Sequence, residues 1–129
     1  MALLFSEKDA SLLPDGTIKV EMRRLDDILG PPVSLIKMNI EGAEPLALQG
    51  MKNILNQSVR PALIIEFNPS YNTKMLIQQL PENSYIGVID DNGGVTQIGI
   101  PELFNLSFNL RNFINLLVLP ENTNVGMER

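Results

Sequence analysis

The sequence of 129 residues contains no cysteine, no histidine and no tryptophan. Without cysteine, the chain has no disulfide framework, no thiolate nucleophile and no zinc–cysteine site. Without histidine, it also lacks the most common general base and the most common metal ligand. We therefore expect no bound metal ion. Any chemistry in this chain has to rely on carboxylates, amides, lysine or tyrosine.

Positive charge and long apolar runs are also scarce. The chain has 10 Lys and Arg residues against 15 Asp and Glu, which leaves a net charge of −5. This balance argues against nucleic acid or an anionic membrane surface as a partner. No apolar run approaches the roughly 20 residues of a membrane span, and residues 1–5 lack the positive flank of a signal peptide. We therefore expect a cytoplasmic protein with one hydrophobic core.

The most informative stretch is residues 33–55. Residues 35–40 form a short, nearly continuous apolar run that is typical of a central parallel strand covered on both faces. Residues 43–55 show the spacing of a helix with one buried face, and Pro45 fits the first turn of that helix. Polar residues stand between the two elements, at the carboxyl end of the strand. Open α/β sheets bind their ligands at this position.

The remaining elements follow from apolar spacing and from turn residues. A strand with one wet face is expected at 17–25, a short helical turn at 26–29 and a second buried parallel strand at 62–67. Further predictions are a helix at 74–80 with Thr73 as its N-cap, hairpin strands at 85–90 and 95–100, a helix at 101–108 and a last strand at 113–119. These elements predict an α/β domain over residues 1–122, followed by a flexible tail at 123–129.

Three motifs carry a resemblance to a known family. The segment Ile36-Lys37-Met38-Asn39-Ile40-Glu41-Gly42-Ala43-Glu44, followed by Leu48-Gln49-Gly50, resembles the core of the FkbM-type methyltransferases. Their usual pattern is a lysine, an aspartate, Glu-Gly-x-Glu and a Leu-x-Gly segment. The segments at residues 25–29 and 61–66 resemble the flanking motifs, and residues 115–120 resemble the last strand of the family. The resemblance implies methyl transfer from S-adenosylmethionine to an oxygen acceptor.

The resemblance covers only the second half of the family's domain. The first half contributes a strand with a glycine-rich turn that holds S-adenosylmethionine. The only glycines before residue 42 are the isolated Gly16 and Gly30, and Gly93-Gly94 is typical of a hairpin turn. We therefore expect a partial doubly wound, Rossmann-like mixed sheet that lacks its cofactor-binding half. Such a chain would be inactive and would not bind S-adenosylmethionine alone, its first half being lost or supplied by another polypeptide.

Five residues are candidates for the site. Asn39, Glu41 and Glu66 are predicted as catalytic residues, and Lys37 and Glu44 as substrate-binding residues. Each also has a structural interpretation. Glu44 fits the positive end of a helix, Lys37 could extend into solvent or pair with a carboxylate, and Glu66 could be a solvated strand end. The amide of Asn39 replaces the family's aspartate, so position 39 has lost the charge needed for a general base.

Three hypotheses remain open for the function. The chain is part of a methyltransferase that needs a partner for its missing half, or a remnant without activity, or an interaction module. Such a module would dock on a complete methyltransferase or on a second copy. Without a preceding half, the strand at 35–40 becomes an open sheet edge. We therefore predict a homodimer or concentration-dependent aggregation through this edge.

Overall fold

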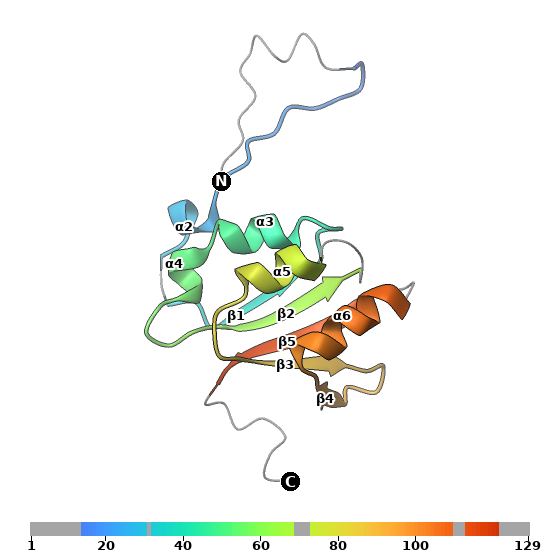
Figure 1. The fold of residues 1–129 in the computed structure, drawn as a ribbon. Coiled ribbons are helices and arrows are strands. Elements are labelled where there is room, and N and C mark those ends of the chain that lie inside the picture. Colours follow the sequence, from blue (N-terminus) through green and yellow to red (C-terminus); the bar gives the residue numbers. More distant parts are fainter. Residues whose placement is uncertain (1–13, 31, 69–72, 110–112, 122–129) are drawn as a thin grey trace.

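The computed structural model describes residues 14–30, 32–68, 73–109 and 113–121. Five strands form one mixed sheet in the order β1-β2-β5-β3-β4, and helices pack against it (Figure 1). In chain order the elements are α2 (Leu25–Ile28), β1 (Leu35–Met38), α3 (Glu44–Gln49), α4 (Lys52–Leu55), β2 (Ala62–Phe67), α5 (Thr73–Gln79), β3 (Ser84–Ile89), β4 (Val95–Gln97), α6 (Ile100–Asn109) and β5 (Ile114–Pro120). The predicted α/β class is therefore confirmed.

The sheet combines one parallel pair of strands with three antiparallel pairs. Strands β1 and β2 run parallel, with Met38 in register with Ile65. The last strand in the sequence, β5, lies in the centre of the sheet, antiparallel to both β2 and β3. Strand β4 extends the sheet through its hairpin with β3. Because β1 pairs only with β2, it forms one edge of the sheet within the described part of the chain.

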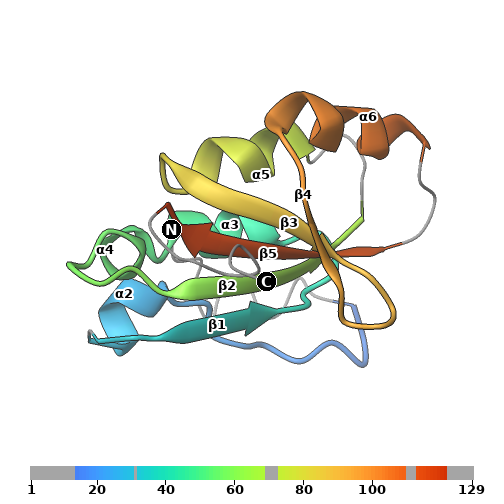
Figure 2. The same ribbon diagram turned by 90° about the horizontal axis from the view of Figure 1, so that it is seen from below.

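The core lies between one face of the sheet and the helices α3, α5 and α6 (Figures 1 and 2). Side chains alternate along a strand, so Leu63 and Ile65 of β2 share this face and are fully buried. Each of the three helices contributes one fully buried leucine to the same cluster: Leu48, Leu76 and Leu103. The core therefore covers one side of the sheet.

The opposite side, which we call the open face, has no described helix packed on it (Figure 2). Its residues alternate with the buried ones, and several are half-buried apolar side chains, among them Ile64 and Leu117. Leu35 of β1 belongs to this face and is 58% exposed. None of the helices in the described ranges is long and apolar enough to cross a membrane.

Most of the predicted elements are present near their expected positions. The hairpin turn follows β3, with Gly93 in a left-handed conformation (φ 83°). The Oδ1 atom of Asp90 accepts the backbone N–H groups of Asn92 and Gly94, each at 2.8 Å. The predicted helices at 74–80 and 101–108 correspond to α5 and α6, and Thr73 is the first residue of α5. The predicted tail at 123–129 lies outside the described residues.

Two strand predictions are wrong. Residues 17–24 form no strand, although the apolar residues alternate there, because no other strand lies beside them in the described part of the chain. The strand predicted at 35–40 ends at Met38 and is not covered on both faces. It has one neighbouring strand. Glu41 and Gly42, three and four residues after Met38, take positive φ angles that turn the chain away.

The single helix predicted at 43–55 is divided into α3 and α4. The break lies at Gly50 and Met51, beside Arg24: a Cβ atom on Gly50 would lie in van der Waals contact with Arg24, 3.4 Å from its Cα atom. The carbonyl of Gly50 accepts the backbone N–H of Asp26 instead of continuing a helix. A contact with a distant part of the chain therefore interrupts the helix.

Candidate functional site

The candidate site is the turn that connects β1 to α3. Glu41 has a φ of 57° and Gly42 a φ of 99°, so two successive residues take the left-handed conformation. The turn closes with a hydrogen bond from the Ala43 N–H to the Ile40 carbonyl at 3.3 Å. A residue with a side chain costs about 1–2 kcal/mol in this conformation, so surrounding contacts must hold Glu41 there.

Glu44 holds this turn from inside the fold. Its side chain is 2% exposed, although a carboxylate is costly to bury without partners. A single oxygen, Oε2, accepts the backbone N–H groups of Ile40 at 3.3 Å and Gly42 at 3.1 Å. Glu44 is also the first residue of α3, where the helix dipole favours a negative charge. The geometry supports the structural interpretation of Glu44, and its part in substrate binding stays a prediction.

The remaining candidates come together at the carboxyl ends of β1 and β2. Asn39 and Glu41 follow β1 and are exposed, while Glu66 is half-buried near the end of β2. Because Met38 is in register with Ile65, Asn39 and Glu66 are the next residues along two neighbouring parallel strands. The structure therefore places these three predicted residues at one end of the sheet, and their catalytic roles stay predictions.

Lys37 lies on the open face rather than in the core. It is exposed and in register with Ile64, whereas its neighbour Met38 is buried under the helices. Within the described ranges it forms no ion pair with a carboxylate. Its ammonium group is thus available at the edge of the sheet, and binding of a substrate by Lys37 stays a prediction.

The sequence interpretation missed Asn115. This residue of β5 is exposed and lies directly opposite Glu66 in the antiparallel ladder. Side chains of directly opposed residues have Cβ atoms about 4.5–5.5 Å apart, so the amide is within reach of the Glu66 carboxylate. The only signal in the sequence is an asparagine inside an otherwise apolar run. Asn115 extends the polar end of the sheet from β2 to β5.

The Leu25-Asp26-Asp27 segment has a structural role in this fold. The carboxylate of Asp26 accepts the N–H groups of Asn53 at 2.9 Å and Ile54 at 3.1 Å, and thereby caps α4. Its own short helix, α2, has no side-chain capping hydrogen bond at its N-cap residue, Arg24. Asp27 accepts two hydrogen bonds from the guanidinium group of Arg24, both at 3.1 Å, and these lower the pKa of the Asp27 carboxyl.

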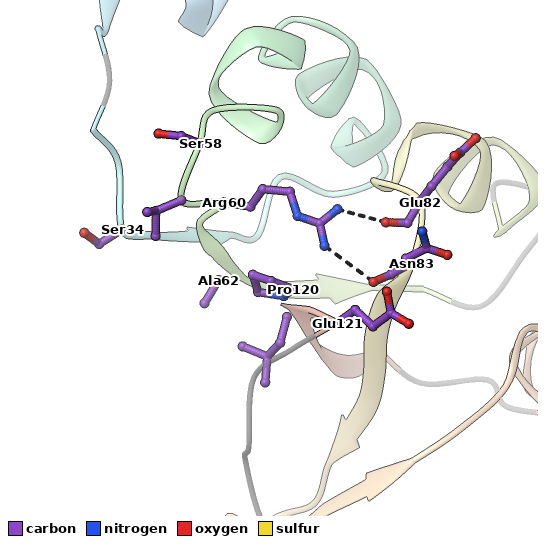
Figure 3. Close-up of a pocket in the computed structure, with 10 residues that line it drawn as sticks. Ser34, Ser58, Arg60, Ala62, Glu82, Asn83, Pro120 and Glu121 are labelled. Carbon is purple, nitrogen blue, oxygen red and sulfur yellow. Dashed lines mark hydrogen bonds between the residues drawn. The ribbon is translucent and has the colours of Figure 1, made fainter.

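A hollow of about 600 Å³ lies at the opposite end of the sheet (Figure 3). There Arg60 donates hydrogen bonds to the backbone carbonyls of Glu82 at 2.8 Å and Asn83 at 3.4 Å. This hollow lies near the amino end of β2, whereas open α/β sheets bind ligands at the carboxyl ends of their parallel strands. No cluster of three or more potential metal-binding Asp or Glu residues occurs in the described part of the chain. The turn after β1 therefore remains the better candidate.

Comparison with known proteins identifies the family. The family model described as the methyltransferase FkbM domain matches residues 5–86, more than half of the chain. This match includes the Leu25-Asp26-Asp27 segment, the acidic turn and the whole of β2. Neither a curated protein nor a solved structure matches the chain. The chain therefore belongs to the FkbM methyltransferase domain family, as its motifs predict.

Proposed function

We propose that this chain forms the acceptor-side half of a methyltransferase that uses S-adenosylmethionine and methylates an oxygen atom. The observation that carries this proposal is the convergence of Asn39, Glu41 and Glu66 at the carboxyl ends of two parallel strands. Ligands of doubly wound sheets bind at this position. In the proposal, the five-stranded sheet is the second half of a Rossmann-like sheet, and the first half adds to the free edge of β1.

The residues of this chain do not form a cofactor site by themselves. A glycine-rich turn is needed where a backbone approaches the cofactor closely, and the 129 residues contain no G-x-G motif. We therefore propose that a different polypeptide segment provides the S-adenosylmethionine site. This chain would provide Glu41 or Glu66 to accept the proton of the acceptor hydroxyl group, while Asn39 and Asn115 orient the acceptor through amide hydrogen bonds.

Two measurements test whether another polypeptide segment provides the cofactor site. Titration calorimetry of the chain alone with S-adenosylmethionine should show no saturable heat up to about 1 mM. Mixing the chain with a fragment that carries the first half of a complete FkbM domain should produce a complex and micromolar cofactor binding. Micromolar binding of S-adenosylmethionine by the chain alone would contradict the proposal that another segment provides the cofactor site. The absence of a complex at about 100 µM of each fragment would contradict the methyltransferase role.

The second candidate function is an interaction module without catalytic activity. One observation favours it: β1 is an edge strand, and apolar residues such as Leu35 remain exposed beside the open face. The amide at position 39 is also a weaker basis for acid–base chemistry than a carboxylate. Glu41→Gln and Glu66→Gln separate the two functions in the mixed complex. Methyl transfer should fall in at least one variant if the enzyme hypothesis holds, with Glu102→Gln on α6 as the matched control.

A further inference from the structure

The strongest unexplained feature is an extended segment that precedes α2. Residues 17–24, which we call the arm, pair with no strand in the described ranges. Ile18, Val20 and Met22 lie on one side of the arm and are 80%, 61% and 47% exposed. Glu21 and Arg23 form an ion pair of 3.2 Å on the other side, as expected for residues two apart in an extended chain. The arm thus has the alternation of a strand without a sheet.

The free edge of β1 is the complementary feature. Strand β1 is hydrogen-bonded to β2 on one side only, and within the described part of the chain no strand covers its other side. Natural edges are commonly protected by proline, bulges or inward-pointing charges. Strand β1 has no proline, and Lys37 is its single charged residue. Its outer backbone groups are therefore free to accept another extended segment.

The arm leaves the molecule in a direction that keeps it away from its own β1. Arg24 is fixed at the end of the arm by its two hydrogen bonds to Asp27 and by close packing against Gly50. Asp26 also donates its backbone N–H to the Gly50 carbonyl at 3.0 Å. From this anchor, the arm projects outward from the helix layer (Figure 1). Its position favours pairing with another molecule.

We propose that the arm of one copy pairs antiparallel with β1 of a second copy, and that the two copies exchange arms reciprocally. The charges select one register. With Glu21 opposite Lys37, opposite charges meet on the open face, whereas a shift of two residues in either direction would place Lys19 or Arg23 against Lys37.

The apolar residues agree with this register. Val20 then lies opposite Met38, and Met22 lies opposite Ile36, on the side of the sheet that the helices cover. A shift of one residue would instead turn the charged side of the arm toward the core, which is costly. The proposal is argued from the arm and β1 alone, but the arm would occupy the same edge of β1 as the first half of a methyltransferase, so the two are alternative occupants of that edge.

Sedimentation velocity of the full 129-residue chain from about 1 to 500 µM tests this exchange. We expect a reversible monomer–dimer equilibrium. Glu21→Lys and Lys37→Glu should each raise the dissociation constant about tenfold, because each places like charges together at two symmetric sites. The double variant Glu21→Lys/Lys37→Glu should restore the wild-type constant. Glu82→Lys and Lys74→Glu are matched charge reversals at exposed positions away from the arm and β1, and should leave it unchanged.

Several results would overturn the exchange. A monomer throughout the concentration range would do so, as would a dimer whose dissociation constant changes in neither Glu21→Lys nor Lys37→Glu. Hydrogen exchange provides a second, independent measurement on the wild-type chain. Within Ile18 to Met22, the amides that face β1 should become protected only as the dimer forms, and so should the amides of β1 that point away from β2. Protection at monomeric concentrations would show that the arm folds back onto its own edge, and would also contradict the proposal.

Discussion

Replacing Glu44 by alanine tests whether the acidic turn is held from inside the fold. The carboxylate is 2% exposed and accepts the N–H groups of Ile40 at 3.3 Å and Gly42 at 3.1 Å. A hydrogen bond to a charged group contributes roughly 1.5–3 kcal/mol. The bond to Ile40 is long, and water reaches this exposed residue, so the two bonds do not add in full. We expect Glu44→Ala to lower the free energy of unfolding by about 2–3 kcal/mol.

The free energy of unfolding is measured by urea unfolding followed by circular dichroism, with two control variants. Both hydrogen bonds go to the same oxygen, so the carbonyl of Glu44→Gln can accept both and should lose only about 1 kcal/mol. Glu41→Ala removes an exposed carboxylate three residues away and should cost less than about 0.5 kcal/mol. Amide exchange of Ile40 should accelerate in Glu44→Ala alone. A loss below about 0.5 kcal/mol in Glu44→Ala would refute the internal role and favour substrate binding.

Four further predictions use the same unfolding assay. Asp26→Ala should lower the free energy of unfolding by about 1–2 kcal/mol because α4 loses its cap, whereas Asp26→Asn should keep most of that stability. Equal losses in the two variants would contradict capping. Glu41→Gly should stabilise the fold by up to about 1 kcal/mol by removing the strain of a left-handed side-chain residue, and a destabilised variant would show that Glu41 makes needed contacts. Asn39→Asp should change stability by less than about 1 kcal/mol, since the side chain is exposed; a larger loss would reveal a structural amide. Arg24 lowers the pKa of the Asp27 carboxyl group, so the pair stabilises the fold above the ordinary carboxyl pKa, and this stabilisation is lost as the pH falls through the lowered pKa. The wild type should therefore lose stability more steeply than Asp27→Asn below about pH 4.

The strands and helices that were predicted correctly are those with strong local patterns. Strand β2 begins with four apolar residues in succession, α5 and α6 have helical spacing, and the Asn92-Gly93 pair indicates a hairpin turn. The failures have a different origin. The arm has the alternation of a strand, but a strand also needs a partner, and pairing is not encoded in the local pattern. The division between α3 and α4 depends on Asp26, which lies 27 residues before the first amide that it caps.

The candidate site shows the same limit at the level of side chains. The carboxyl end of β1 could be predicted as a polar cluster, because polar residues follow an apolar run there. The inward direction of the Glu44 side chain could not be predicted, since a carboxylate at the start of a helix can bind either the backbone of a turn or a ligand. Asn115 was missed because its position beside Glu66 depends on β5 inserting between β2 and β3. That insertion becomes visible only in the assembled sheet.

Two residues of the family motifs have structural roles in this fold. Asp26 and Glu44, which belong to two of the family motifs, bind backbone N–H groups and thereby stabilise the turn and α4. Losing either residue would reduce stability, whether or not the protein performs chemistry. A match that depends partly on such residues is therefore stronger evidence for the fold than for catalysis. Position 39, where the family's aspartate is replaced, is exposed and has no comparable structural constraint in the described part of the chain. For this reason, cofactor binding in the mixed complex is a more decisive test of the enzyme hypothesis than any further comparison of motifs.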